Sequence, residues 1–186
     1  MFMYEMHYMK IKTVSIATVV TFALILMGSV IGNALGSTQQ GNNPYSLIAI
    51  WVSEGAGDGE FAEPHGVAVD SSDNVYVTDR DNCKVEKLSA DGSFIRKWGS
   101  IGRDDGEFID PHGIDFDSSD NVYVVDSQNE RIQKFDSDGN FITKWGSEGY
   151  GDSQFWLPHD IAIDASNNVY VVDSGNVHEK KDVCAL

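Results

Sequence analysis

The sequence has few cysteines and few basic residues, and each shortage narrows what the chain can be. Its 186 residues include 2 Cys and 4 Pro, and 13 Lys plus Arg stand against 29 Asp plus Glu. Two cysteines, Cys83 and Cys184, exclude a disulfide-stapled mini-fold and a four-thiolate metal site within one chain. The formal charge of -16 argues against a nucleic-acid partner, because each phosphate contact needs a cation. A hydrophobic content of 41% is enough for a folded core.

A sustained helical period is also missing after residue 37, and the long apolar run lies before it. Residues 14–31 carry no charge, follow Lys10 and Lys12, and precede a stretch of small residues at 32–37. This arrangement predicts a signal peptide or an N-terminal membrane anchor over residues 1–36, formed by one hydrophobic helix, and then a polar linker over 37–46. Both alternatives place the remaining chain outside the cytoplasm, secreted or, if the segment is not cleaved, anchored at the cell surface.

The rest of the sequence is a repeat with a period of 47 residues. Three kinds of residue recur at this spacing, namely Pro64, Pro111 and Pro158; Trp51, Trp98 and Trp145; and Phe61, Phe108 and Phe155. Each unit divides into four short apolar runs, which in the first unit cover residues 66–69, 74–78, 84–88 and 94–98. Runs this short between Asp-Gly and Ser-Asp-Asn turns predict antiparallel strands joined by hairpins. A four-stranded meander at this period predicts an all-β fold of propeller blades over residues 47–176.

The repeat resembles the NHL repeat family. The resemblance rests on the Pro-His-Gly start, on the Asn-Val-Tyr-Val strand at residues 121–124, and on the Arg-Ile-Gln-Lys-Phe and Phe-Ile-Thr-Lys-Trp-Gly runs at 131–135 and 141–146. It implies a six-bladed β-propeller, which at this period would need about 280 residues. The chain holds about two and a half blades. Propellers host many unrelated activities, so the resemblance leaves the function open.

The repeat pattern ends after Asn176. His178 and Glu179 stand where the second unit has Arg131 and Ile132, so we expect no third strand from the aberrant tail at residues 177–186. A truncated or frameshifted reading frame would produce this ending, and would make the chain a fragment without independent function. The alternative is a homo-oligomer in which three chains complete one ring, each supplying two blades and lending the strand at residues 47–52 to a neighbour, since open blades expose apolar faces and strand edges.

Three histidines are the strongest candidates for chemistry. His65, His112 and His159 follow the repeated prolines, at one end of the innermost strand of each blade, so their imidazoles are expected to point toward a shared axis. Three imidazoles with an open fourth position form a typical catalytic zinc site. The motifs resemble the zinc-binding Pro-His motifs of the peptidyl-alpha-hydroxyglycine alpha-amidating lyases, which also use a tyrosine and an arginine. The alternative is structural: Pro-His-Gly is then a common form of the repeat, and a neighbouring loop hydrogen-bonds the ring.

The repeated acidic residues favour structural roles. Asp79, Asp126 and Asp173 end the second strand of each unit, and we expect Asp126 to pair with Arg131 inside its blade. The Asp-Gly turns at residues 136–140 and 104–107 lack the spacing of a calcium loop and are typical of hairpin turns. The two cysteines could pair in an oxidising compartment.

Together these patterns predict an exported propeller segment that binds a protein or another extracellular ligand and is not catalytic. The alternative is a zinc-dependent lyase or hydrolase that uses His65, His112 and His159. A basic patch with interleaved aromatic residues is absent, so an RNA-binding role is rejected.

Overall fold

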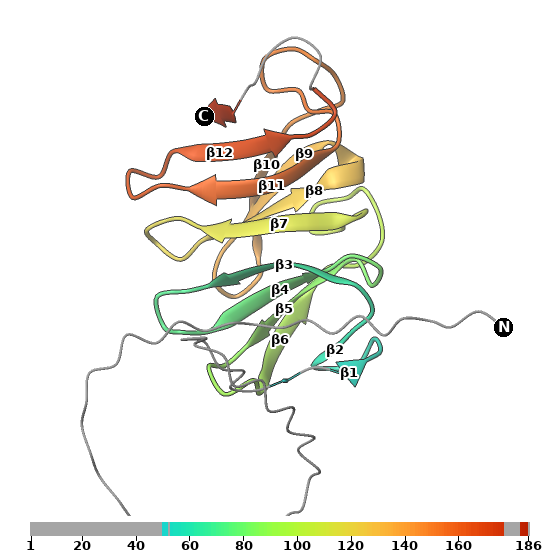
Figure 1. Cartoon of the computed structure of the whole chain (residues 1–186), viewed down its shortest axis with the longest axis vertical. Helices are drawn as coiled ribbons and strands as arrows, with labels where there is room; N and C mark the ends of the chain where they lie inside the picture. The colour runs from blue at the N-terminus through green and yellow to red at the C-terminus, as the bar shows by residue number, and fades with distance from the viewer. Residues whose placement is uncertain (1–49, 52, 177–182, 186) are drawn as a thin grey trace, which may run out of the picture. The chain divides into compact units, whose positions relative to one another are not determined.

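The computed structural model describes residues 50–51, 53–176 and 183–185 (Figure 1). The predicted signal peptide or anchor and the linker lie outside the described residues, as does nearly all of the predicted strand at 47–52. Within the described part of the chain, no helix is long and apolar enough to cross a membrane. Ser53–Glu54 (β1) and Glu60–Phe61 (β2) form a short parallel pair ahead of the blades.

The described residues form all-β blades, as the sequence predicts. Blade 1 contains Pro64–Val69 (β3), Val75–Asp79 (β4), Lys84–Leu88 (β5) and Phe94–Trp98 (β6). Blade 2 contains Pro111–Phe116 (β7), Val122–Asp126 (β8), Arg131–Phe135 (β9) and Phe141–Trp145 (β10), with a short 3-10 helix, Ser127–Asn129 (η1), between its second and third strands. Blade 3 contains Pro158–Ile163 (β11), Val169–Asp173 (β12) and Val183–Ala185 (β13). All pairings within these three sheets are antiparallel.

The repeated turns are closed by their own aspartates. Asp136 Oδ1 accepts hydrogen bonds from the backbone N–H groups of Asp138, at 2.9 Å, and Asn140, at 2.8 Å. Asp70, Asp117 and Asp164 close the turns between the first and second strands in the same way. These bonds agree with the hairpin-turn interpretation of the acidic residues, because the carboxylates are engaged by the loops that carry them.

The core lies between neighbouring blades. Tyr76 and Val85 of blade 1 pack against Phe108, Ile114 and other apolar residues of blade 2, and a second cluster joins blades 2 and 3 in the same way. The inner strands β3, β7 and β11 lie side by side (Figure 1). Glycine permits this close approach, since a Cβ built on Gly66 would lie 2.4 Å from the carbonyl oxygen of His112. The glycine of each Pro-His-Gly motif is therefore explained by packing between strands.

The expectation that residues after Asn176 supply no third strand was wrong. Val183–Ala185 pairs with β12 and joins Val172 to Val183 and Tyr170 to Ala185. In blade 2 the equivalent of Val172, Val125, pairs with Ile132. The repeat register would have placed Glu179 opposite Val172. The residue that pairs with Val172 is instead Val183, four residues later, so a valine takes the position that Ile132 has in blade 2. A strand edge bonds through its backbone, and any short apolar stretch that arrives in register can occupy it.

Candidate functional site

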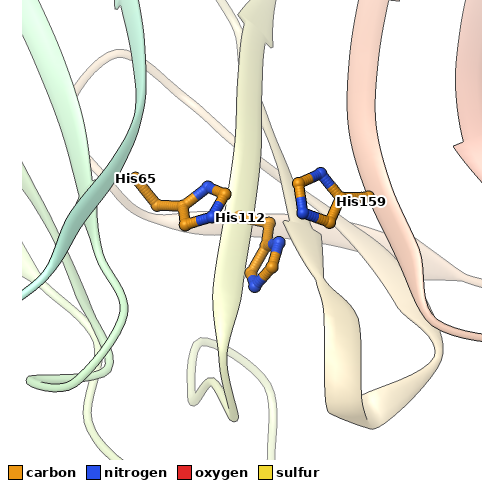
Figure 2. Close-up of side chains that lie close together, drawn as sticks. All are labelled: His65, His112 and His159. Atoms are coloured by element: carbon orange, nitrogen blue, oxygen red, sulfur yellow. The ribbon is translucent and has the colours of Figure 1, made fainter. Parts of the chain in front are cut away.

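The three repeated histidines converge, as the sequence predicts. His65 on β3, His112 on β7 and His159 on β11 point toward one another from three neighbouring strands (Figure 2). One ring nitrogen from each lies within 4.8 Å of the others. The rings of His65 and His112 are stacked, with centroids 4.0 Å apart, and the ring of His159 stands at a steep angle to both. We call these three residues the histidine cluster.

His112 is the buried centre of the cluster. It is 7% exposed, whereas His65 and His159 are exposed. Neither of its ring nitrogens has a hydrogen-bond partner among the described residues, although Nε2 lies 3.3 Å from Asp110 Oδ1. Buried polar atoms nearly always have a partner, because losing water without replacement costs about 1–3 kcal/mol. Within the described part of the chain, the loop contact that the structural alternative requires is limited to Asp110, and Nδ1 of His112 has no partner.

The environment keeps two of the imidazoles neutral. Burial lowers the pKa of His112 below its usual value of 6.5, and the neighbouring His65 adds to the effect. The pKa of His65 is also lowered, first by the partial loss of water around its ring and then by the positive charges that His159 and Arg80 would present. A neutral imidazole has a free lone pair, and only this form can bind a metal ion. The cluster is therefore suited to hold a cation other than the proton at neutral pH.

The cluster is close to the geometry of a zinc site without matching it. Zinc binds histidine nitrogen at about 2.0–2.1 Å, which for a tetrahedral site places the nitrogens about 3.4 Å apart. The nitrogens here lie within 4.8 Å, and the rings of His65 and His112 are stacked, so a shared metal would require one of these two rings to rotate as well as to approach. His65 and His159 are exposed and have room to rotate around the buried His112. The donor set and the unpartnered nitrogens of His112 fit a divalent transition metal.

A charged group lies beside the cluster and was not predicted as part of the site. Arg80, in the turn after β4, contacts Glu63 at 2.9 Å and Asp110 at 2.9 Å. Asp110 in turn faces His112, as described above. The sequence places an arginine in this turn, yet the contact joins blade 1 to blade 2. Asp110 also has a positive φ, 62°, a backbone conformation that aspartate adopts more readily than most residues, and the sequence alone does not reveal it.

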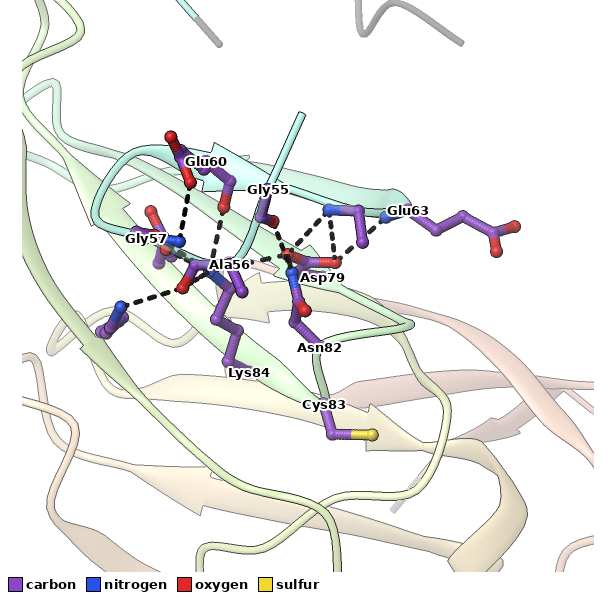
Figure 3. Close-up of polar contacts among 12 residues, drawn as sticks. Gly55, Ala56, Gly57, Glu60, Glu63, Asp79, Asn82, Cys83 and Lys84 are labelled. Carbon is purple, nitrogen blue, oxygen red and sulfur yellow. Dashed lines mark hydrogen bonds and ion pairs between the residues drawn. The ribbon is translucent and has the colours of Figure 1, made fainter. Parts of the chain in front are cut away.

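A second polar cluster, the anchor of blade 1, is fully engaged by the protein. Asp79 accepts hydrogen bonds from the backbone N–H groups of Ala62 and Glu63, at 3.1 to 3.3 Å, and from the Asn82 amide at 2.7 Å (Figure 3). Lys84 Nζ donates to Glu86 Oε1 at 2.6 Å and to the carbonyl oxygen of Glu60 at 2.9 Å. All three charged side chains of this anchor are buried. They hold the loop before β3 onto the end of the blade.

The anchor of blade 2 is equivalent but has a different charge. Arg131 Nε donates to Asp126 Oδ2 at 2.6 Å, which agrees with the predicted pair inside the blade. The two terminal guanidinium nitrogens of Arg131 donate to the carbonyl oxygens of Arg103, Asp104 and Glu107. Gln133 stands where blade 1 has Glu86, and bonds Asp126 at 3.0 Å. The repeated aspartates are therefore structural, since their partners are backbone groups and neighbours of the same blade.

The cysteines form no site in the described part of the chain. Cys83 is buried with a free thiol at the junction of blades 1 and 2, and burial raises its pKa. The side chain of Cys184 lies outside the described residues, so the pairing of the two cysteines stays a prediction. A raised thiol pKa lowers the reactivity of Cys83, because the thiolate is the nucleophile.

Comparisons with known proteins support the blade assignment. The family model "NHL repeat" matches residues 61–88, and the family model "6-bladed beta-propeller" matches residues 102–178. The protein lin-41 of Caenorhabditis elegans is 44% identical over 50 residues, which cover 27% of this chain and 4% of that protein.

Two solved structures show the same fold. A protein of unknown function from Bacteroides thetaiotaomicron superposes with a TM-score of 0.56 and 20% identity, over 71% of this chain and 37% of that one. A candidate exported protein from Bacteroides fragilis superposes with a TM-score of 0.52 and 13% identity, over 65% of this chain and 32% of that one. The chain spans well under half the length of each relative. At these identities the two structures support the fold alone.

Proposed function

Because the chain carries NHL repeats folded as the blades of a β-propeller, we propose that it is a binding module of an exported propeller, and that its ligand site contains the histidine cluster. The partner is a protein or another extracellular ligand. One observation carries the proposal: three blades each supply one histidine to a single point, and the buried one has no partner among the described residues. Structural side chains in these blades, such as Asp79 and Asp126, are by contrast saturated with hydrogen bonds.

The same observation supports a bound divalent transition metal, and zinc is the ion we propose. His65, His112 and His159 would hold it, and the fourth position would remain available to a ligand atom. A metal there would give the module a strong Lewis acid for carboxylate, carbonyl or thiolate groups of its partner. Asp110, which lies 3.3 Å from His112, would orient the ring, as carboxylates commonly do for metal-bound histidines.

Zinc titration of the purified chain tests this proposal. After removal of bound metal with a chelator, calorimetry should show one zinc ion per chain, and His112→Leu should lower the affinity by at least about 100-fold, a loss of about 2.7 kcal/mol. Asp138→Asn is the matched control, because Asp138 is exposed at a distant turn, and should bind zinc as the natural chain does. Equal zinc affinity in the His112→Leu variant would refute the proposed site.

An enzymatic role is the second candidate, and it is favoured by a positively charged side chain beside the cluster. Arg80 lies beside His65 and Asp110, where a positive charge could hold an anionic substrate group. Three histidines and an arginine suit a zinc-dependent lyase or hydrolase similar to the peptidyl-alpha-hydroxyglycine alpha-amidating lyases. The turns at residues 80–82 and 127–129 carry no tyrosine, which departs from that family.

The two functions are separated by activity assays. Zinc-loaded protein should be incubated with peptides that end in α-hydroxyglycine, and with Arg80→Met as the comparison. Cleavage that falls in the Arg80→Met variant while zinc content stays constant would establish the enzyme. Zinc binding without cleavage would leave the binding module.

A further inference from the structure

Blade 1 exposes a face that blade 2 buries. Val67 is 47% exposed and Val69 is 53% exposed. Their equivalents in blade 2 are Ile114, which is 5% exposed, and Phe116, whose ring lies 4.8 Å from that of Tyr76. Blade 1 therefore carries at this face the residue types that blade 2 uses to bind a preceding blade.

Blade 3 exposes the opposite face. Val172 is 51% exposed, whereas the equivalent residues Thr78 and Val125 are fully buried. Thr78 donates a hydrogen bond to the carbonyl oxygen of His112 at 2.6 Å, and Val125 belongs to the core between blades 2 and 3. Val172 thus lies where blades 1 and 2 are covered by the blade that follows.

Polar contacts between the turns repeat at the same two junctions. The backbone N–H of Ser71 donates to Asp120 Oδ1 at 3.1 Å, and that of Ser118 donates to Asn167 Oδ1 at 2.8 Å. The residues at the next equivalent positions are Ala165 on blade 3 and Asp73 on blade 1, and both are exposed. The two exposed faces therefore hold one half each of a donor and acceptor pair that already joins the blades within the chain.

We infer that these two faces bind each other between two copies of the chain. Blade 3 of one copy, through Val172 and Ala165, would dock onto Val67, Val69 and Asp73 of the other copy. The described residues of each chain form three blades, so two such sets joined head to tail at both junctions form a ring of six, the number that the matching family model describes. On this inference two chains complete the ring, whereas the sequence alone suggested three.

Trp51 of a second copy could complete blade 3 by occupying its fourth-strand position. A Cβ built on Gly92 would lie 2.4 Å from Trp51, as one on Gly139 would lie 2.7 Å from Trp98 in the fourth strand of the preceding blade. Trp51 therefore occupies, on blade 1, the place of a fourth-strand tryptophan. Blade 3 consists of β11, β12 and β13 in the described part of the chain. A docked copy would bring its Trp51 to the fourth-strand position of blade 3.

One residue departs from the repeated junction and sharpens the inference. Asp160 stands where blades 1 and 2 have Gly66 and Gly113, and a side chain at either glycine would collide with the next inner strand. The junction between copies must therefore be wider than the junctions within the chain, and the association correspondingly weaker. Replacing Asp160 with glycine should tighten it.

Co-purification of two differently tagged full-length chains in non-ionic detergent tests the inference. The natural chains should co-purify at twice the chain mass of 20.4 kDa. Val67→Lys alone and Val172→Lys alone should each abolish the pairing, because each damages one face at both junctions. Mixing the two variants should restore it, since the mixture retains one junction with two intact faces.

The outcomes decide the inference in each case. Natural chains that remain single, or lysine variants that pair as the natural chain does, would overturn it. Both valines are exposed, so the variants should fold, and unchanged unfolding curves check this. Asp160→Gly should strengthen co-purification, and a weaker signal from this variant would contradict the proposed junction.

Discussion

The histidine cluster and the anchors of the blades are both made of polar residues repeated at 47-residue intervals, yet their polar atoms differ in how many hydrogen bonds they make. In the anchor of blade 2, Arg131 donates from three nitrogens, to the Asp126 carboxylate and to backbone carbonyl oxygens. In the histidine cluster, Nδ1 of His112 is buried without a partner in the described part of the chain, and Nε2 has only the Asp110 carboxylate, 3.3 Å away. Repetition alone therefore does not distinguish a structural residue from a candidate ligand. The convergence of three rings does, because the repeated Trp98 and Trp145 also bury an unpartnered indole nitrogen but do not gather at one place among the described residues.

The comparison predicts that stability and metal affinity depend on different residues. Changes in the anchors should cost stability and leave metal affinity intact, since the anchor atoms already use their bonding capacity inside the fold. Changes around the cluster should cost metal affinity and little stability. Each prediction below tests this separation, and each variant is measured by both unfolding and zinc titration.

The largest effect is expected at the anchor of blade 2. Arg131→Ala removes the cation beside the fully buried Asp126 and leaves several carbonyl oxygens without a donor. Breaking a buried ion pair from one side typically costs about 3–5 kcal/mol, and we expect a loss of this size in urea unfolding. Zinc affinity of the folded variant should stay within about twofold, or roughly 0.4 kcal/mol. A stable Arg131→Ala variant that had lost zinc would invert the assignment.

Asp110→Asn should produce the second largest effect, and it should lower zinc affinity instead of stability. The carboxylate lies 3.3 Å from His112 and 2.9 Å from Arg80, so the change weakens the orientation of the ring while preserving size. Loss of such an orienting partner usually lowers metal affinity about 10- to 100-fold. Thermal unfolding of the metal-free protein should change little. Unaltered zinc affinity would remove Asp110 from the site.

The smallest effect is a dependence of stability on pH in the metal-free protein. The pKa values of His65 and His112 are lowered in the folded chain, chiefly by burial. As the pH falls through 6.5, the unfolded chain takes up protons on these rings before the folded chain does, so the free energy of unfolding decreases and its loss is complete below the folded pKa values. We expect a measurable decline between about pH 7.5 and about pH 5.5, the range that spans the unfolded pKa. His112→Leu should flatten this slope.

The sequence predicted most of the fold because each strand is bounded by its own turn residues. The expected runs at 84–88 and 94–98 coincide with β5 and β6, and β3 begins two residues before the expected start at Gly66, because Pro64 pairs with Asp79 across a bulge. The convergence of the histidines followed from the register of the repeat. The roles of Asp110 and Arg80 could not be predicted, since they depend on a contact between blades. The strand Val183–Ala185 escaped prediction because its register departs from the repeat.

X-ray absorption at the zinc edge of the zinc-loaded chain tests the histidine cluster most directly. The account predicts three histidine nitrogens at about 2.0–2.1 Å and one further light ligand, and a nitrogen count that falls in the His112→Leu variant. The spectrum of the Asp138→Asn control should match that of the natural chain. A first shell made of carboxylate oxygens, or of the sulfur of Cys83 or Cys184, would contradict the account and place the metal elsewhere.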